Sequence, residues 1–121
     1  HNVDGIKYVC GHLDFLHQKF NQELHIVFGM VNDKDISSVL QELPKDATYY
    51  FTKASVKRAL PENELLALAE EAGLKGTTYP TVVEAVQAAK KNCPPKDLIF
   101  VGGSSFIVAD LLANRDTLNL Y

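Results

Sequence analysis

FGMVNDKD, from Phe28 to Asp35, lies between an apolar run that ends at Phe28 and a helical pattern that begins at Asp35. The stretch therefore predicts a buried strand, a polar turn and a helix, in that order. Ligands of open α/β sheets collect at the carboxyl ends of strands, so Asp33, Lys34 and Asp35 form a candidate site. The structural alternative is that the acidic residues cap the helix and that Lys34 is solvated.

Strand-like and helix-like segments alternate along the rest of the chain. The expected strands cover 23–30, 47–52 and 98–101, and the propensities within 75–79 also allow a short edge strand. The expected helices cover 3–20, 35–43, 61–72 and 81–92, and a last helix follows Ser105. Thr81 and Glu84 form the T-x-x-E pattern of a capping box at the start of one of them. The alternation predicts one α/β domain, a Rossmann-like three-layer sandwich with a mostly parallel sheet and helices on both faces.

The length, composition and net charge of the chain exclude several classes of protein. A chain of 121 residues with a net charge of −3 can bury one core and gives no general case for binding nucleic acid or an anionic membrane. Its apolar runs are too short to span a bilayer, and its amino end has no apolar segment typical of a signal peptide. Cys10 and Cys93 are interpreted as thiols, which predicts a reducing, cytoplasmic location. No histidine stands in a Cys/His spacing, so no metal site is expected.

The turn GGSS at 102–105 follows the last expected strand and precedes the last expected helix. Glycines permit a tight turn, and the first amides of a helix, with its dipole, favour an anion such as a carboxylate or phosphate. Ser104 would add a hydroxyl, and the alternative is that it only caps the helix. The turn is neither a G-x-G-x-x-G fingerprint nor a P-loop, and no nucleophile stands beside a paired base. These residues therefore indicate a domain that binds and positions a ligand.

A basic segment, TKASVKRAL at 52–60, also follows an expected strand end. It carries Lys53, Lys57 and Arg58. The forked donors of the Arg58 guanidinium suit a carboxylate, such as one of glutamate. The structural alternative is that Arg58 is a solvated loop arginine.

Three pieces of the chain together resemble a known family. The pair His1-Asn2 is similar to the end of a D-x-A-H-N motif, FGMVNDKD to an FGM-x-x-DKD segment, and FVGGSSFIVADLL to a final strand, turn and helix. In this order they resemble the carboxy-terminal domain of folylpolyglutamate synthases, including the bifunctional dihydrofolate synthases of bacteria, in the Mur ligase superfamily. The resemblance covers nearly the whole chain, and FGM-x-x-DKD is its specific part. The D-N-P-R segment of some wall-building members is absent.

The resemblance implies an ATP-dependent ligase that adds glutamate to a folate through an acyl phosphate. Residues 1–121 would be its Mur ligase C-terminal (glutamate-ligase) domain, which closes the cleft and contributes to the glutamate and ATP sites. The chain starts with His1 and not with Met, so it is interpreted as a fragment of a larger enzyme. The enzyme's central domain, absent here, would hold ATP and Mg, so the fragment should be inactive and bind no cofactor tightly. Its partners would be this ATPase domain, folate, glutamate and ATP.

The resemblance also assigns roles to individual residues. His1 and Lys34 would be catalytic, and His1 with Asn2 would face ATP. The glutamate-binding residues would be Ser104, Asp33, Asp35 and Arg58. The Asp that precedes the motif histidine in the family lies outside this sequence, so its role is not carried over.

Two other classes of function stay open from the sequence. One is a stand-alone doubly wound module that binds a nucleotide or small anion without catalysis, and the other is a purely structural interaction domain. A gene that continues upstream of His1 into a P-loop domain would favour the ligase, whereas a reading frame that starts near His1 would favour the alternatives.

Overall fold

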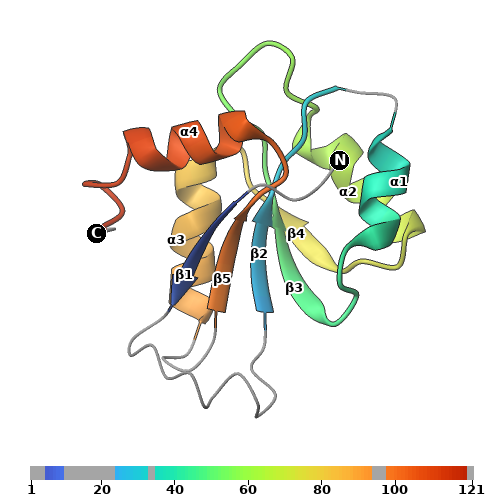
Figure 1. Cartoon of the computed structure of the whole chain (residues 1–121), viewed down its shortest axis with the longest axis horizontal. Helices are drawn as coiled ribbons and strands as arrows, with labels where there is room; N and C mark the ends of the chain where they lie inside the picture. Colours follow the sequence, from blue (N-terminus) through green and yellow to red (C-terminus); the bar gives the residue numbers. More distant parts are fainter. Residues whose placement is uncertain (1–4, 10–23, 33–34, 94–97, 120–121) are drawn as a thin grey trace.

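One five-stranded sheet organises the chain (Figure 1). The computed structural model describes residues 5–9, 24–32, 35–93 and 98–119. The strands are β1 (Gly5–Val9), β2 (Leu24–Phe28), β3 (Ala47–Phe51), β4 (Gly76–Thr78) and β5 (Leu98–Gly102). They lie in the order β1-β5-β2-β3-β4, in which β1 pairs antiparallel with β5 and the other pairs are parallel. The expected mostly parallel sheet is confirmed, and the short edge strand forms as β4.

Helices cover both faces of this sheet, as a three-layer sandwich requires (Figure 1). The helices are α1 (Ile36–Glu42), α2 (Glu62–Glu71), α3 (Val82–Asn92) and α4 (Ser105–Ala113). Buried residues of α3 and α4 pack together with one face of the strands, and those of α1 and α2 pack with the other face. The expected α/β sandwich is therefore confirmed.

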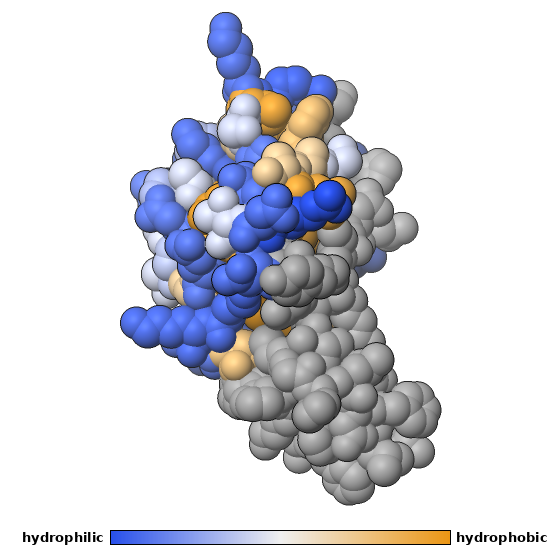
Figure 2. Space-filling view, turned by 90° about the vertical axis from the view of Figure 1, so that its left-hand side faces the viewer, coloured by the Kyte–Doolittle hydropathy of each residue, from blue (hydrophilic) through white to orange (hydrophobic). Residues whose placement is uncertain are grey.

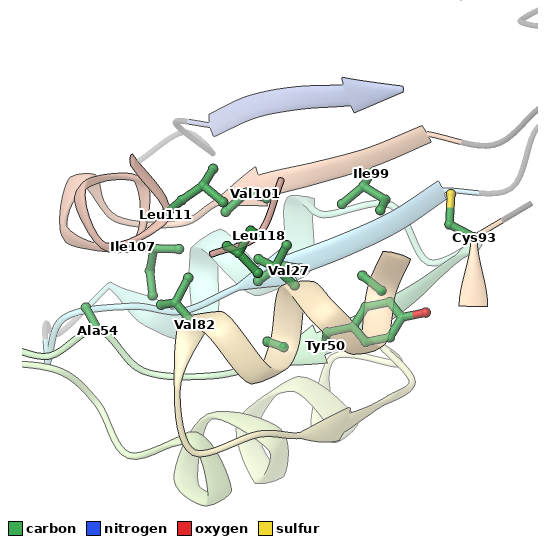
Figure 3. Packing of buried hydrophobic residues seen from close by; sticks show 13 residues of the cluster. Val27, Tyr50, Ala54, Val82, Cys93, Ile99, Val101, Ile107, Leu111 and Leu118 are labelled. Carbon is green, nitrogen blue, oxygen red and sulfur yellow. The ribbon is translucent and has the colours of Figure 1, made fainter. Parts of the chain in front are cut away.

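Two separate apolar clusters stabilise the layers because successive side chains of a strand point to opposite faces. On β2, Val27 joins the cluster under α3 and α4, whereas Ile26 and Phe28 join the cluster under α1 and α2. Figure 3 shows the first cluster, in which side chains of β2, β3 and β5 meet those of α3 and α4. Leu118, beyond α4, is only 2% exposed and also belongs to it. The segment after α4 thus contributes one side chain to the core.

The helix ends follow local chemistry that the sequence predicts. The Thr81 side-chain oxygen accepts from the Glu84 amide at 3.2 Å, so the expected cap at Thr81 is confirmed. The Glu84 carboxylate accepts from the Thr81 hydroxyl at 3.2 Å, in place of the backbone amide that a full capping box uses. Helix α1 ends with Leu43 as its C-cap, immediately before Pro44. Gly73, with φ +85°, follows the C-cap of α2 and ends that helix as expected.

The expectation of a helix over residues 3–20 is wrong where the structure describes it. Residues 5–9 form strand β1, which pairs with β5 from Gly5↔Gly102 to Val9↔Leu98. The apolar spacing of three and four suggested a helix, but this short piece contains the β-favouring Ile6, Tyr8 and Val9. Pairing with a free sheet edge therefore outweighs the helical pattern. The rest of that expected helix, including 10–20, lies outside the described residues.

Cys93 is disulfide-bonded, so the expectation of a thiol at this position is wrong. The spacing of the two cysteines in the sequence carries no information on which parts of a fold come together. The sequence-based argument for a reducing compartment thus loses its premise at Cys93, and Cys10 lies outside the described residues. Within the described part of the chain, no helix is long and apolar enough to cross a membrane.

Candidate functional site

The carboxyl ends of β2, β3 and β5 meet at one edge of the sheet. The amide of Gly29, just after β2, donates to the Gly102 carbonyl at 3.2 Å. The amide of Thr52, just after β3, donates to the Phe28 carbonyl at 2.9 Å. The three loops that follow these strands therefore start side by side, where ligands of such sheets collect.

The turn after β5 forms the tightly packed base of this edge. Gly103 has φ +103°, which residues with a side chain rarely adopt. A Cβ atom there would lie 2.3 Å from the Gly29 carbonyl oxygen and 2.8 Å from the Phe28 ring. Glycine is therefore required at this position, and the close approach fixes where the next residue, Ser104, stands.

Ser104 is the N-cap of α4 and is partly exposed. Its side-chain oxygen accepts from the Phe106 amide at 3.1 Å, so the structural alternative of a helix cap is confirmed. This bond uses a lone pair of the hydroxyl and leaves its hydrogen able to donate to a carboxylate oxygen. The cap also places the hydroxyl at the positive end of the α4 dipole. Capping and anion binding are thus compatible at Ser104.

The loops after β2 and β3 are joined to each other, which local patterns did not reveal. Val31 and Ala59 form an isolated antiparallel bridge. The Asn32 amide donates to the Arg58 carbonyl at 2.7 Å, and the Leu60 amide donates to the Met30 carbonyl at 2.8 Å. The two loops therefore behave as one short ribbon at the carboxyl edge.

Three cations lie on the loop after β3. Lys53, Lys57 and Arg58 are all exposed or partly exposed. Within the described part of the chain, none of the three makes an ion pair. Because no opposite charge neutralises them there, they can attract an anionic ligand. Arg58 is exposed, as its structural alternative as a solvated residue expects, and its role in binding a carboxylate stays a prediction.

The loop after β3 is also attached to α4 through Ser55 and Asp110. The Ser55 amide donates to Asp110 Oδ2 at 2.8 Å, and the Ser55 hydroxyl donates to Oδ1 at 2.9 Å. A shallow groove beside this contact is lined by residues of the loop, of the start of α3 and of α4, among them Ser55, Thr81, Val82, Asp110 and Asn114. No pattern in the sequence signals this contact, because its members are 55 positions apart.

The structure describes only part of the residue set expected at the site. Asp35 is exposed and stands at the N-cap position of α1, but its side chain makes no cap hydrogen bond, so the structural alternative of a helix cap is wrong for Asp35. Ser104, Arg58 and Asp35 follow strands that end at this one edge, and no hydrogen bond joins the side chains of these three described residues. The other expected site residues, His1, Asn2, Asp33 and Lys34, lie outside the described residues.

The described residues offer no site for a resident metal. No group of three or more His, Cys, Asp and Glu side chains among them could hold a metal ion. The one described group with a resolved pKa shift, Tyr49, lies on β3 away from this edge, where burial raises its pKa to about 12.

The surface around α3 and α4 is mostly hydrophilic, with small hydrophobic areas between the polar ones (Figure 2). Phe106 and Leu112 of α4 are the large hydrophobic residues exposed within the described part of the chain, at 38% and 50%. Phe106 lies next to the GGSS turn in the sequence. The edge therefore combines a hydroxyl, cations and a small apolar area.

Residues 1–105 match the family model described as Mur ligase, glutamate ligase domain. Among curated proteins, the chain is 31% identical to the dihydrofolate synthase/folylpolyglutamate synthase of Buchnera aphidicola, over 100% of this chain and 28% of that protein. It is also 31% identical to a probable bifunctional folylpolyglutamate synthase/dihydropteroate synthase of Haloferax volcanii, over 91% of this chain and 13% of that protein. The chain thus spans well under a third of the length of these relatives.

Solved structures share the fold of this chain. The structure of E. coli FolC in complex with DHPP and ADP superposes with a TM-score of 0.72 at 24% identity, over 86% of this chain and 25% of that one. A bifunctional folylpolyglutamate synthase/dihydrofolate synthase from Yersinia pestis, complexed with AMPPNP and a Mn ion, gives 0.68 at 24% identity, over 84% and 24%. At this identity the likeness shows the fold.

Proposed function

This chain belongs to the Mur ligase family, in which residues 1–105 match the glutamate ligase domain, and from that premise we propose that it is the carboxy-terminal domain of an ATP-dependent folylpolyglutamate synthase. We further propose that the intact enzyme also acts as a dihydrofolate synthase. The observation that carries the proposal is the 31% identity, across the whole chain, to a Buchnera aphidicola protein named for both activities.

In the proposed reaction, the γ-phosphoryl group of ATP moves to the terminal carboxylate of the pterin substrate, and ADP leaves. The amine of glutamate then attacks the carbonyl carbon of this acyl phosphate, an amide bond forms, and inorganic phosphate leaves. Negative charge develops on oxygen atoms in both steps, so fixed donors and cations near those oxygens accelerate them. The domain contributes such groups when it closes over a separate ATPase domain.

Ser104 is the proposed contact for a carboxylate of the incoming glutamate. Its oxygen accepts from the Phe106 amide, which orients the hydroxyl at the start of α4. The hydroxyl hydrogen and the positive end of the helix dipole both favour a carboxylate there. Because the neighbouring Gly103 is closely packed against Gly29, the position of this group is fixed before glutamate binds.

Arg58 and its neighbours supply the proposed positive charge. Arg58, Lys53 and Lys57 lie at the surface of a loop that begins at the same edge as Ser104. A guanidinium can hold a carboxylate through two parallel hydrogen bonds, which suits the second carboxylate of glutamate. Asp35, also exposed at this edge, and Asp33 would attract the amine of glutamate.

The remaining roles follow the family resemblance. His1 and Lys34 are proposed as the catalytic groups of this domain, and His1 with Asn2 as the residues that face ATP. ATP and magnesium would be held mainly by the central domain of the intact enzyme, and folate by the cleft between the domains. The proposal places no magnesium ligand among the described residues.

An assay of the intact protein that contains residues 1–121 tests this function. With ATP, magnesium, glutamate and either dihydropteroate or tetrahydrofolate, we expect glutamate-dependent release of ADP and a product heavier by one glutamyl group. The rate should reach the range typical of enzymes, about 1 per second or more. The 121-residue chain alone should give no product, because the proposed ATP site lies outside it.

Two results would contradict the proposal. If the intact protein releases no ADP in response to glutamate with either pterin, the ligase function is wrong. If the 121-residue chain alone binds magnesium-ATP tightly, a stand-alone nucleotide-binding module becomes the better account. Titration of the chain with ATP, followed by NMR, distinguishes tight binding from the weak or absent binding that we expect.

A further inference from the structure

The contact between Ser55 and Asp110 connects two segments that the proposed function uses separately. Ser55 belongs to the loop that carries Lys53, Lys57 and Arg58, and Asp110 belongs to α4, whose cap is Ser104. Both donors of Ser55 engage the carboxylate, the amide at 2.8 Å and the hydroxyl at 2.9 Å. Two hydrogen bonds to one charged acceptor define both the distance and the orientation of the loop relative to the helix.

Apolar packing also stabilises the contact between Ser55 and Asp110. Ala54, the residue before Ser55, is 3% exposed and belongs to the cluster that contains Ile107 and Leu111 of α4. Asp110 lies between these two residues in the sequence. The Asp110 carbonyl also accepts from the Asn114 side chain at 2.8 Å. The helix side of the contact is therefore held in place independently of the loop.

The far end of the loop is held by a different set of bonds. The Arg58 carbonyl accepts from the Asn32 amide at 2.7 Å, and Ala59 forms the bridge to Val31. Only two residues, 56 and 57, separate Ser55 from Arg58. The basic loop is thus fixed at both ends, to α4 at Ser55 and to the loop after β2 at Arg58.

We propose that Asp110 is a positioning residue for glutamate, because it holds the basic loop at the distance from Ser104 that allows both to engage one glutamate molecule. This inference rests on the proposed function. Asp110 acts through Ser55 and needs no contact with substrate. Without the contact, the loop is no longer attached to α4 at Ser55. The cations of the loop and the Ser104 hydroxyl then no longer form a preformed pair of binding sites for the two carboxylates of glutamate.

Because Asp110 is charged, an experiment can distinguish its positioning of the loop from a direct electrostatic effect on the bound anion. As a carboxylate, it opposes the binding of an anion nearby, so its removal would on charge alone strengthen glutamate binding. An Asn at this position accepts from the Ser55 amide through its oxygen and donates to the Ser55 oxygen through its amide. Asp110→Asn therefore keeps both hydrogen bonds while it removes the charge.

The test compares three variants of the intact protein in the glutamate assay. Asp110→Ala should raise the apparent KM for glutamate roughly fivefold or more, in line with the cost of misplacing a binding group. The KM for ATP should stay within about twofold of its original value, since the change affects only one substrate. Asp110→Asn should restore the KM for glutamate. Asp116→Ala, which removes another exposed acidic residue near the end of α4, serves as the control.

Ser55→Ala keeps the experiment informative if Asp110→Ala fails to fold. This exposed position tolerates the change, and the variant loses only the hydroxyl bond to Asp110, so an intermediate KM is expected. A readout without activity is the hydrogen exchange of the Ser55 amide in the 121-residue chain. Asp110→Ala should speed this exchange about tenfold or more, and Asp110→Asn should not.

Each outcome decides the proposal. A lowered melting temperature of Asp110→Ala with an unchanged KM for glutamate would show that the contact only stabilises the fold, and would overturn the inference. An Asn variant as impaired as the Ala variant would overturn it as well, because both hydrogen bonds are then present. If the unmodified protein never consumes glutamate, the proposed function fails instead, and the exchange experiment alone still tests whether Asp110 fixes the loop.

Discussion

The two ends of the parallel strands use their polar groups in different ways. Toward the amino ends, buried polar groups are paired with each other: His25 Nδ1 lies 2.9 Å from the Tyr50 hydroxyl, and the Tyr49 hydroxyl donates to the Pro44 carbonyl. At the carboxyl ends, Arg58 and the neighbouring cations are at the surface, and the Ser104 hydroxyl retains a hydrogen to donate. The polar groups toward the amino ends thus stabilise the fold, whereas those at the carboxyl ends remain able to bind a ligand.

This difference separates the residues that build the domain from those that we propose bind the ligand. Substitutions toward the amino ends should change the free energy of unfolding and leave glutamate kinetics unaltered. Substitutions of exposed groups at the carboxyl edge should do the reverse. The close-packed base of the carboxyl edge is the exception, since it serves both purposes.

Gly103→Ala should give the largest loss of stability. The new Cβ would lie 2.3 Å from the Gly29 carbonyl oxygen, and φ of +103° is itself unfavourable for alanine. The strained backbone at this position and the displacement of the neighbouring atoms should together lower the free energy of unfolding by about 3 kcal/mol or more. Urea denaturation of the 121-residue chain measures this loss.

The matched control is Gly73→Ala. This glycine also has a positive φ, +85°, but its nearest new contact would be an ordinary 3.5 Å to Lys45 Cδ. Only the backbone cost of about 1–2 kcal/mol should appear. Equal losses for the two variants would show that the carboxyl edge is not closely packed around Gly103.

Tyr49 should make stability depend on alkaline pH. Burial raises its pKa from 10.0 to about 12, so above pH 10 the unfolded chain loses a proton that the folded chain keeps. The contribution of Tyr49 is complete below pH 10 and is lost as the pH rises toward 12, by roughly 2–3 kcal/mol. Tyr49→Phe should remove this part of the pH dependence.

Denaturation of both chains at a series of pH values between 9 and about 12 gives the difference directly, and other titrating groups cancel in it. At neutral pH the variant should lose only the hydrogen bond to Pro44, worth about 1 kcal/mol. An identical pH dependence in the two chains would mean that Tyr49 ionises as easily in the fold as in the unfolded chain.

Thr52→Val should have the smallest effect on the free energy of unfolding, and the direction of the change is informative. The Thr52 side chain is fully buried at the carboxyl end of β3, and its hydroxyl oxygen has no hydrogen-bond partner within the described part of the chain. Removing an unpaired buried hydroxyl should raise the free energy of unfolding by about 1 kcal/mol. Thr48→Val, at an exposed position within β3, should change it little. A loss of stability in Thr52→Val would reveal a partner for this hydroxyl.

Local patterns in the sequence predicted most of the fold. The apolar runs located β2, β3 and β5, and the capping pattern at Thr81 and Glu84 located the start of α3. Each of these signals lies within a few neighbouring residues, where propensity and capping decide the structure. The helix expected over 3–20 failed in its described part because pairing with β5 is a long-range contact that spacing does not reveal.

The site was predictable only in part, for the same reason. The sequence identified FGMVNDKD and GGSS as separate candidate sites near strand ends, and the parallel pairing of β2 with β5 brings their starts to one edge of the sheet. The bridge from Val31 to Ala59 and the contact from Ser55 to Asp110 join segments that are distant in the sequence. No local pattern marks such pairs, and the arrangement of the basic loop therefore emerged from the structure alone.

The apparent KM for glutamate of the Ser104→Gly variant of the intact protein tests the central claim most directly. Glycine replaces a helix cap at a cost of only a few tenths of a kcal/mol, so the fold should survive while the hydroxyl is lost. We predict a rise of about fivefold or more in this KM, as expected for one lost hydrogen bond to a charged group, with an unchanged KM for ATP. Ser105→Ala, next to it at the start of α4, should change neither. An unaltered KM for glutamate in Ser104→Gly would contradict the claim that this edge holds the incoming glutamate.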